Sequence, residues 1–202
     1  MATYTVKASF FSSSLVTLVL LLEPLLRSSS VEASTSHRHR IPTLTMYNAL
    51  IIQGPNSTEG FNAVQCGGPA AQLPNMFGNI FCFDMPLLKE QNISSELYGT
   101  VQGSWVATRI TGGTIVVSET FIFANETSLG YQGTFSALGI ENIGQQTSKP
   151  ITGGTGDFEL ATGIAITTPL GQGTTDAFGN AFFWFKYEFM FGCQCPSSCH
   201  SP

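Results

Sequence analysis

The sequence predicts an all-β fold in which eight antiparallel strands close into a barrel. From residue 44 onward, short runs rich in Val, Ile, Thr and Phe recur between clusters of Gly, Pro and Asn, and no long amphipathic helix pattern interrupts them. The length of 202 residues suits one domain with appendages. Hydrophobic residues make up 43% of the chain and charged residues 10%, so the chain can bury a core and lacks the composition of a disordered protein.

The first 33 residues have the pattern of a secretion signal. Lys7 precedes an apolar stretch from Ala8 to Leu22, and small residues around Ala33 offer a cleavage site. A membrane anchor is the alternative, but serines and a threonine dilute a stretch that is already short for a bilayer. We therefore expect export to the extracellular space. Residues 34–43 are polar and aperiodic, and we expect them to form a flexible arm.

The barrel is expected to span residues 44–191, with a Cys-rich tail at 192–202. Its eight predicted strands share β-branched and aromatic residues and end at turn-forming residues. They are Leu44 to Gln53, Phe61 to Cys66, Phe77 to Asp84, Tyr98 to Thr108, Thr114 to Ala124, Gly130 to Gly139, Asp157 to Thr167 and Ala181 to Phe191. Closure would remove exposed strand edges, and a barrel of this strand number has room for one small ligand.

Two glycine runs, at 112–113 and 153–156, are interpreted as turns, because glycine adopts the positive φ that tight connections need. A phosphate-binding loop at 153–156 is excluded, since no Lys-Ser/Thr pair and no helix follow it.

Alternation along two predicted strands separates an inner from an outer face. In the last strand, aromatic side chains from Phe183 to Phe191 share one face, which should pack against apolar material. The same alternation from Thr114 to Ala124 places Glu119 among apolar side chains. Either this face is exposed or a bulge redirects Glu119, or the carboxylate is an acid inside a ligand pocket.

The five cysteines are an odd number for a compartment that favours disulfides. Cys66 and Cys82 lie in apolar runs, and we expect them to be small buried hydrophobes. The disulfide candidates are the tail cysteines Cys193, Cys195 and Cys199. These cysteines and His200 lack the paired spacing of structural zinc sites, so no metal is expected.

The net charge of -5, without any basic run, gives no footprint for binding nucleic acid or an anionic membrane. Three Asn-x-Ser/Thr triplets are predicted glycosylation sites if they lie at the surface. Their asparagines are Asn56, Asn92 and Asn125.

Several motifs, taken in order, resemble the dirigent family of plant proteins. They are Phe77-Gly78-Asn79, Phe83-Asp84-Met85-Pro86-Leu87, Gly99-Thr100-Val101-Gln102-Gly103, Phe121-Ile122-Phe123, Gly130-Tyr131-Gln132-Gly133-Thr134 and Ile151-Thr152-Gly153-Gly154-Thr155-Gly156-Asp157-Phe158. The resemblance runs from Leu44 to Phe191 and implies a barrel of the type shared with allene oxide cyclase.

The resemblance also implies a function. A dirigent protein is an extracellular homo-oligomer, a dimer or trimer, which needs no cofactor and captures phenoxy radicals or quinone methides of monolignols such as coniferyl alcohol. A separate oxidase of the laccase or peroxidase type makes the radicals, and the dirigent partner imparts stereoselectivity on their coupling in lignan biosynthesis. In physical terms, an apolar interior orients two reactants while a few polar groups hold the phenol oxygens.

Three acidic residues are candidate pocket residues: Glu141, Asp84 and Glu119. Glu141 is similar to an Asp that the family has after the sixth strand, and Asp84 keeps its place in the family motif, where it can also cap a turn. A carboxylic acid can protonate a quinone methide, whereas a carboxylate can accept a phenolic proton. Burial raises the pKa of such an acid and suits it to the first role.

Other positions depart from the family pattern. Asn48 follows Tyr47 where many members have a His-Asp pair, and Thr100 stands where Arg is common. Shortly before the GGTG run, where the family has a basic residue, this chain has Lys149, which cannot form the paired hydrogen bonds of an arginine guanidinium. The pocket is therefore expected to be altered. Two alternatives stay open: a non-catalytic cell-wall or defence protein, and a cyclase or isomerase on the same barrel.

Overall fold

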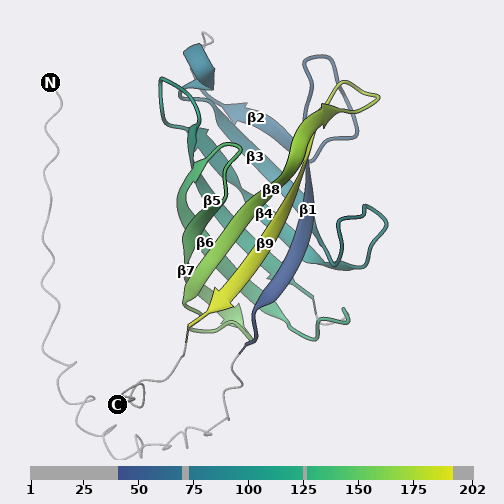
Figure 1. The fold of residues 1–202 in the computed structure, drawn as a ribbon, viewed down its shortest axis with the longest axis vertical. Helices are drawn as coiled ribbons and strands as arrows, with labels where there is room; N and C mark the ends of the chain where they lie inside the picture. Colours follow the sequence, from purple (N-terminus) through teal and green to yellow (C-terminus); the bar gives the residue numbers. More distant parts are fainter. Residues whose placement is uncertain (1–40, 70–72, 125–126, 193–202) are drawn as a thin grey trace, which may run out of the picture. The chain divides into compact units, whose positions relative to one another are not determined.

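Nine strands form one closed barrel in the part of the chain that the structure describes, residues 41–69, 73–124 and 127–192 of a computed structural model (Figure 1). The strands are β1 (Leu44–Ile52), β2 (Ala63–Gly67), β3 (Ile80–Leu88), β4 (Leu97–Ala107), β5 (Thr114–Phe123), β6 (Gly133–Asn142), β7 (Thr147–Gly156), β8 (Gly163–Thr175) and β9 (Ala181–Phe191). They follow one another around the barrel, and antiparallel pairing of β1 with β9 closes it. The predicted all-β barrel is confirmed, with nine strands rather than eight.

The strand absent from the sequence prediction is β7. Its sequence, TSKPITGGTG, contains a proline and three glycines, which are typical of turns. Gly154 nevertheless belongs in this strand because neighbouring backbone lies very close. A Cβ atom added there would lie 2.5 Å from the carbonyl oxygens of Thr134 and Phe158. The predicted strand Asp157 to Thr167 was wrong in its first part, where residues 157–160 form a turn before β8.

The short strand β2 meets β1 through a single parallel pair, Ile52 with Ala63. The side chain of Asn62 supplements this contact. Its Oδ1 accepts a hydrogen bond from the Ile51 backbone N–H at 2.8 Å, and its Nδ2 donates to the Ala49 carbonyl at 2.7 Å. Asn62 thus supplies hydrogen bonds that a longer β2 would make with its backbone.

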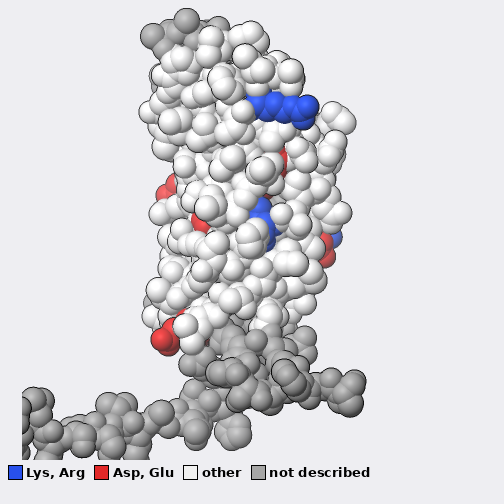
Figure 2. Space-filling view, turned by 90° about the vertical axis from the view of Figure 1, so that its left-hand side faces the viewer, with Lys and Arg blue, Asp and Glu red and all other residues white. Residues whose placement is uncertain are grey.

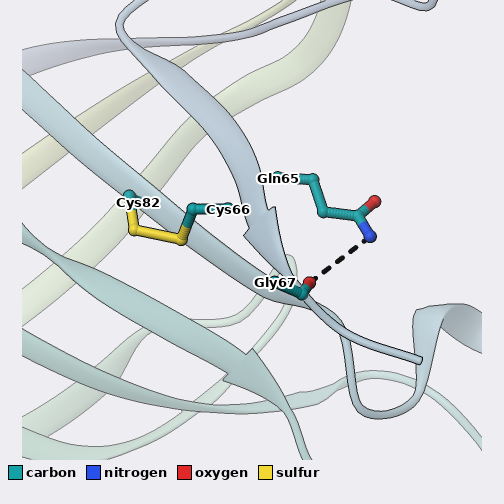
Figure 3. The surroundings of a disulfide bond; sticks show 4 residues. All are labelled: Gln65, Cys66, Gly67 and Cys82. Carbon is teal, nitrogen blue, oxygen red and sulfur yellow. Dashed lines mark hydrogen bonds between the residues drawn. A yellow bond between two sulfur atoms is a disulfide. The ribbon is translucent and has the colours of Figure 1, made fainter. Parts of the chain in front are cut away.

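A disulfide joins β2 to β3 through Cys66 and Cys82, with their Cα atoms 5.8 Å apart (Figure 3). The expectation that both are buried free thiols was wrong, because both side chains are exposed and bonded. The strands pair antiparallel with a register shift between Gln65 and Gly67, and the two cysteines lie within bonding range there. Closing a loop of this length stabilises a fold by about 3 kcal/mol.

The end of the barrel where β1 begins and β9 ends is filled with aromatic rings, and we call it the closed end. Its members are Phe121, Phe123, Phe135, Phe158, Phe189 and Phe191. Phe158, from the turn after β7, is fully buried, and its ring centroid lies 5.0 Å from those of Phe123 and Phe135. The turn thereby inserts a plug into the barrel.

Inward-facing side chains at the opposite end keep partial exposure, and we call it the half-open end. Its members are Leu50, Ile52, Trp105, Ile115 and Phe185. Phe81 stacks on Trp105 with ring centroids 4.9 Å apart and planes 6° apart. This end of the interior is therefore apolar, aromatic and partly reached by solvent.

Several sequence predictions fall outside the described residues. These are the secretion signal, most of the 34–43 arm, Asn125 and the three tail cysteines. Across residues 41–69, 73–124 and 127–192, no helix is long and apolar enough to cross a membrane.

Replacing the plug tests the packing of the closed end. We expect Phe158→Ala to lower the free energy of unfolding by about 3–5 kcal/mol, because it leaves a cavity among rings that cannot collapse. Urea denaturation measures this loss. Phe178→Ala is the matched control, since Phe178 is 54% exposed in a turn, and it should cost less than about 1 kcal/mol. Equal losses in the two variants would contradict the assignment of Phe158 as a plug.

Candidate functional site

A layer of polar side chains crosses the barrel between the closed and half-open ends. Its fully or almost fully buried members are Asn48, Glu119, Lys149, Thr167 and Tyr187. Charged side chains are few and scattered on the face of the molecule in Figure 2. A buried Lys and Glu are rare in proteins unless they are paired, so this layer requires an explanation.

Glu119 points into the barrel from β5. It pairs in regular register with Gly103 of β4 and Ala137 of β6, and no bulge lies at this position. The alternation that places Glu119 with Phe121 therefore holds, and its side chain is only 3% exposed. Of the two explanations open at the sequence level, the exposed or redirected carboxylate does not apply, and Glu119 is an interior acid.

Lys149 enters the same layer from β7 and bridges two glutamates. Its Nζ lies 2.6 Å from Glu119 Oε2, and the two groups form an ion pair that lacks hydrogen-bond geometry. The same ammonium group donates a hydrogen bond to Glu141 Oε1. The Lys149 side chain is fully buried. Gly139 of β6 leaves space for it, because a Cβ atom there would lie 2.9 Å from Lys149 Cγ.

Tyr187 of β9 completes the group, which we call the charge cluster: Glu119, Glu141, Lys149 and Tyr187. The Tyr187 hydroxyl donates to Glu119 Oε1 at 2.6 Å. Asn48 lies beside this hydroxyl and donates through Nδ2 to Met85 Sδ at 3.4 Å. Within the described residues, Asn48 Oδ1 and the Thr167 hydroxyl are buried without a hydrogen-bond partner.

Burial and neighbouring charges shift the pKa values of three residues of the charge cluster. Burial raises the pKa of the Glu119 carboxyl, Lys149 opposes this shift, and the like charge of Glu141 adds to it. Burial lowers the pKa of Lys149, but the two carboxylates outweigh it and hold that pKa above its ordinary value. The ammonium has two counter-ions, whereas Glu119 has one counter-ion and one like charge. Burial, followed by the Glu119 charge, also raises the pKa of Tyr187, which stays a hydrogen-bond donor.

Glu141 is the member of the cluster that lies nearest to solvent. Its side chain is 15% exposed, against 3% for Glu119. In the pairing of β5 with β6, Glu141 lies opposite Ile115 of the half-open end. A ligand that enters from this end would meet Glu141 before Glu119. The structure thus brings together two of the three acidic candidates, with a lysine between them.

The third candidate, Asp84, lies elsewhere. Its side chain is on the outer face of β3, exposed, and accepts a hydrogen bond from Gln102 at 3.2 Å. There it borders a shallow hollow of about 340 Å³ beside β2 and β3. The hollow is lined by Phe61, Asn62, Ala63, Val64, Cys82, Phe83 and Asp84.

Two members of the charge cluster did not emerge from the sequence as site residues. Lys149 was noted near the family's basic position but set aside because it is not an Arg, and no strand was predicted there, although Lys149 and Ile151 alternate with exposed neighbours. Tyr187 was read only as one of five aromatic residues on an inward face. A polar tip within an otherwise apolar stripe is the signal that marks it.

The remaining sequence-predicted sites are at the surface or not described. Asn56 and Asn92 are exposed, as glycosylation would require. Within the described ranges, no three His, Cys, Asp or Glu side chains gather in a way that could hold a metal ion.

Comparison with known proteins identifies the family. The family model described as Dirigent-like protein matches residues 41–185, which cover most of the chain and three of the four cluster residues. The chain belongs to the dirigent family. A dirigent protein from Sinopodophyllum hexandrum is 28% identical over 176 residues, which cover 79% of this chain and 86% of that protein. Dirigent protein 25 from Arabidopsis thaliana is 30% identical over 130 residues, 60% of this chain and 32% of the relative.

Solved dirigent structures share the barrel. The pterocarpan synthase dirigent proteins GePTS1 and PsPTS1 superpose with TM-scores of 0.58 and 0.59. Each is 23% identical to this dirigent chain and matches 75% of it, and the match covers 90% and 96% of the respective solved chains. At this identity the likeness supports the fold.

The raised pKa of Glu119 predicts a pH-dependent stability. Between the ordinary value of 4.5 and the higher folded-state pKa, the folded protein holds the proton more tightly than the unfolded chain. The stability that the folded protein gains from this tighter proton binding is complete below pH 4.5 and is lost as pH rises through the folded-state pKa of Glu119. In urea denaturation from about pH 4 to 8, the stability of the wild type relative to Glu119→Gln should fall as pH rises. A difference that stays constant with pH would contradict the burial of an ionisable Glu119.

Proposed function

We propose that this chain is a dirigent protein that imparts stereoselectivity on the coupling of phenoxy radicals from monolignols such as coniferyl alcohol. A separate oxidase of the laccase or peroxidase type supplies the radicals. The observation that carries the proposal is the position of Glu141, a partly exposed carboxylate at the border between the apolar half-open end and the buried charge cluster.

The half-open end offers what a phenolic ring requires. Trp105 and the stacked Phe81 present aromatic faces, and offset stacking of a further ring contributes about 0.5–1.5 kcal/mol beyond the buried area. Glu141 offers an oxygen to the phenolic hydroxyl, which fixes the ring's direction. The unpartnered Asn48 Oδ1 and Thr167 hydroxyl add polar groups deeper in the same layer. Holding a radical in one orientation selects the face at which it couples.

The proposal extends to the setting of the reaction. Family membership and the sequence-level signal support export to the apoplast, assembly as a homo-oligomer and a role in lignan biosynthesis. The chain itself is proposed to need no cofactor and to perform no oxidation.

A second candidate is a cyclase that acts on a closed-shell quinone methide. One observation favours it: Tyr187, Glu119, Lys149 and Glu141 form an unbroken polar path from the barrel interior to the half-open end. Such a path can carry a proton to or from a ligand. Turnover of a quinone methide without any oxidant would distinguish this activity from radical coupling.

Oxidation of coniferyl alcohol by a one-electron oxidant, with and without the purified protein, tests the proposal. Chiral chromatography of the dimers should show an enantiomeric excess only when the protein is present. Glu141→Gln should remove most of that excess, because a hydrogen bond to a charged group contributes about 1.5–3 kcal/mol.

Asp84→Asn is the matched control for Glu141→Gln, because Asp84 lies on the outer face of β3, and it should leave the excess unchanged. A racemic product with the wild type would argue against coupling of this phenol and favour the non-catalytic wall protein. An unaltered excess in Glu141→Gln would show that Glu141 is not the site.

A further inference from the structure

Glu119 places a carboxyl group deep in the barrel, where a ligand from the half-open end would meet Glu141 first. Its side chain is 3% exposed, and both of its oxygens already have partners within the cluster, the Lys149 ammonium and the Tyr187 hydroxyl. Burying a carboxylate destabilises the fold unless other groups compensate, because desolvation costs several kcal/mol per ion. The contacts of Glu119 therefore indicate the role of this side chain.

Those contacts converge on Lys149. Glu119 and Glu141 lie on neighbouring strands, β5 and β6, and face the same ammonium group from β7. Tyr187 fixes the other oxygen of Glu119, and its ring lies 5.8 Å below the Lys149 Nζ. Gly139 leaves the space through which the lysine side chain passes. Lys149 is thus held from several directions and points at Glu141.

We propose that Glu119 is a positioning residue, which holds the Lys149 ammonium against Glu141 so that Glu141 meets a phenolic hydroxyl as an oriented, ion-paired carboxylate. This inference rests on the proposed function and gives Glu141 one of its two conceivable roles, that of a hydrogen-bond acceptor. Glu119 does not touch the ligand. Its influence on Glu141 passes through Lys149.

The electrostatics of the cluster support this division of roles. Of the two carboxylates that share one ammonium, the more deeply buried Glu119 loses more by being charged. Burial raises the pKa of Glu119, whereas Glu141 reaches the half-open end with a 15% exposed side chain and an ion pair with Lys149.

The ammonium group of Lys149 can be observed directly. The full sequence contains four lysines, Lys7, Lys89, Lys149 and Lys186, so a protein labelled with ¹⁵N-lysine gives few side-chain signals in an NMR spectrum. Loss of one signal in Lys149→Met assigns the buried group. In Glu119→Gln, which keeps an acceptor for Tyr187, the Lys149 signal should shift and its protons should exchange with solvent at least about tenfold faster.

The partly exposed pair Lys186 and Glu188, with Nζ and Oε2 2.9 Å apart on β9, provides the control. Glu188→Gln should alter the Lys186 signal and leave both the Lys149 signal and the enantiomeric excess unchanged. Tyr187→Phe is a second variant that loosens Glu119 without removing its carboxyl group, and it should accelerate Lys149 exchange less than Glu119→Gln does. It decides the question if Glu119→Gln does not fold.

Product analysis supplies the functional half of the test. Glu119→Gln should lower the enantiomeric selectivity roughly 10- to 100-fold, as misplacing a binding group does, while coniferyl alcohol still binds within about twofold. Unchanged Lys149 exchange in Glu119→Gln would overturn the proposal. So would unchanged selectivity in Glu119→Gln when Glu141→Gln abolishes it. If the wild type gives racemic dimers, the proposed function fails, and the NMR comparison still decides whether Glu119 holds Lys149.

Discussion

An ammonium group inside a barrel must be neutralised, and this constraint organises the interior of the protein. Lys149 is fully buried, and taking it out of water costs several kcal/mol unless anions and hydrogen bonds replace the lost solvent. Glu119 from β5 and Glu141 from β6 provide the anions, and the Tyr187 hydroxyl from β9 holds Glu119 in place by a hydrogen bond. Because a slip of one residue in any of these strands would turn its polar side chain outward, the cluster also specifies strand register.

The charge cluster divides the barrel into two halves with different tasks. On one side, aromatic rings and the Phe158 plug fill the space and stabilise the closed end. On the other, aromatic residues such as Trp105 keep partial exposure, and Glu141 reaches their border. An apolar surface with one oriented polar group is the combination that orients a small aromatic ligand. In the proposed function, the rigidity of the first half would allow the second half to hold a ligand in one direction.

The sequence predicted the fold better than the site. Alternating Phe and Tyr in β9 and the Val, Ile and Thr runs of the other strands were sufficient for an all-β barrel. The glycines and proline of β7 concealed a strand, because glycine in a turn and glycine at a close backbone approach look alike in sequence. Glu119 was placed on the correct face by alternation alone. Its partners were not foreseen, since Lys149 and Tyr187 meet it only when β5, β7 and β9 close around one interior. Cys66 and Cys82 were misread for a similar reason, because pairing depends on the register of β2 with β3.

The balance of charge inside the barrel is the central claim, and a comparison of two variants tests it most directly. Lys149→Met leaves two carboxylates without a counter-ion and should lower the free energy of unfolding by about 3–5 kcal/mol. Adding Glu119→Gln removes the more deeply buried of the two carboxyl groups and should recover most of the loss, because only the partly exposed Glu141 then lacks a counter-ion. Urea denaturation of the wild type, both single variants and the double variant gives the coupling energy. Strictly additive losses would show that Glu119 and Lys149 do not depend on each other and would contradict this account.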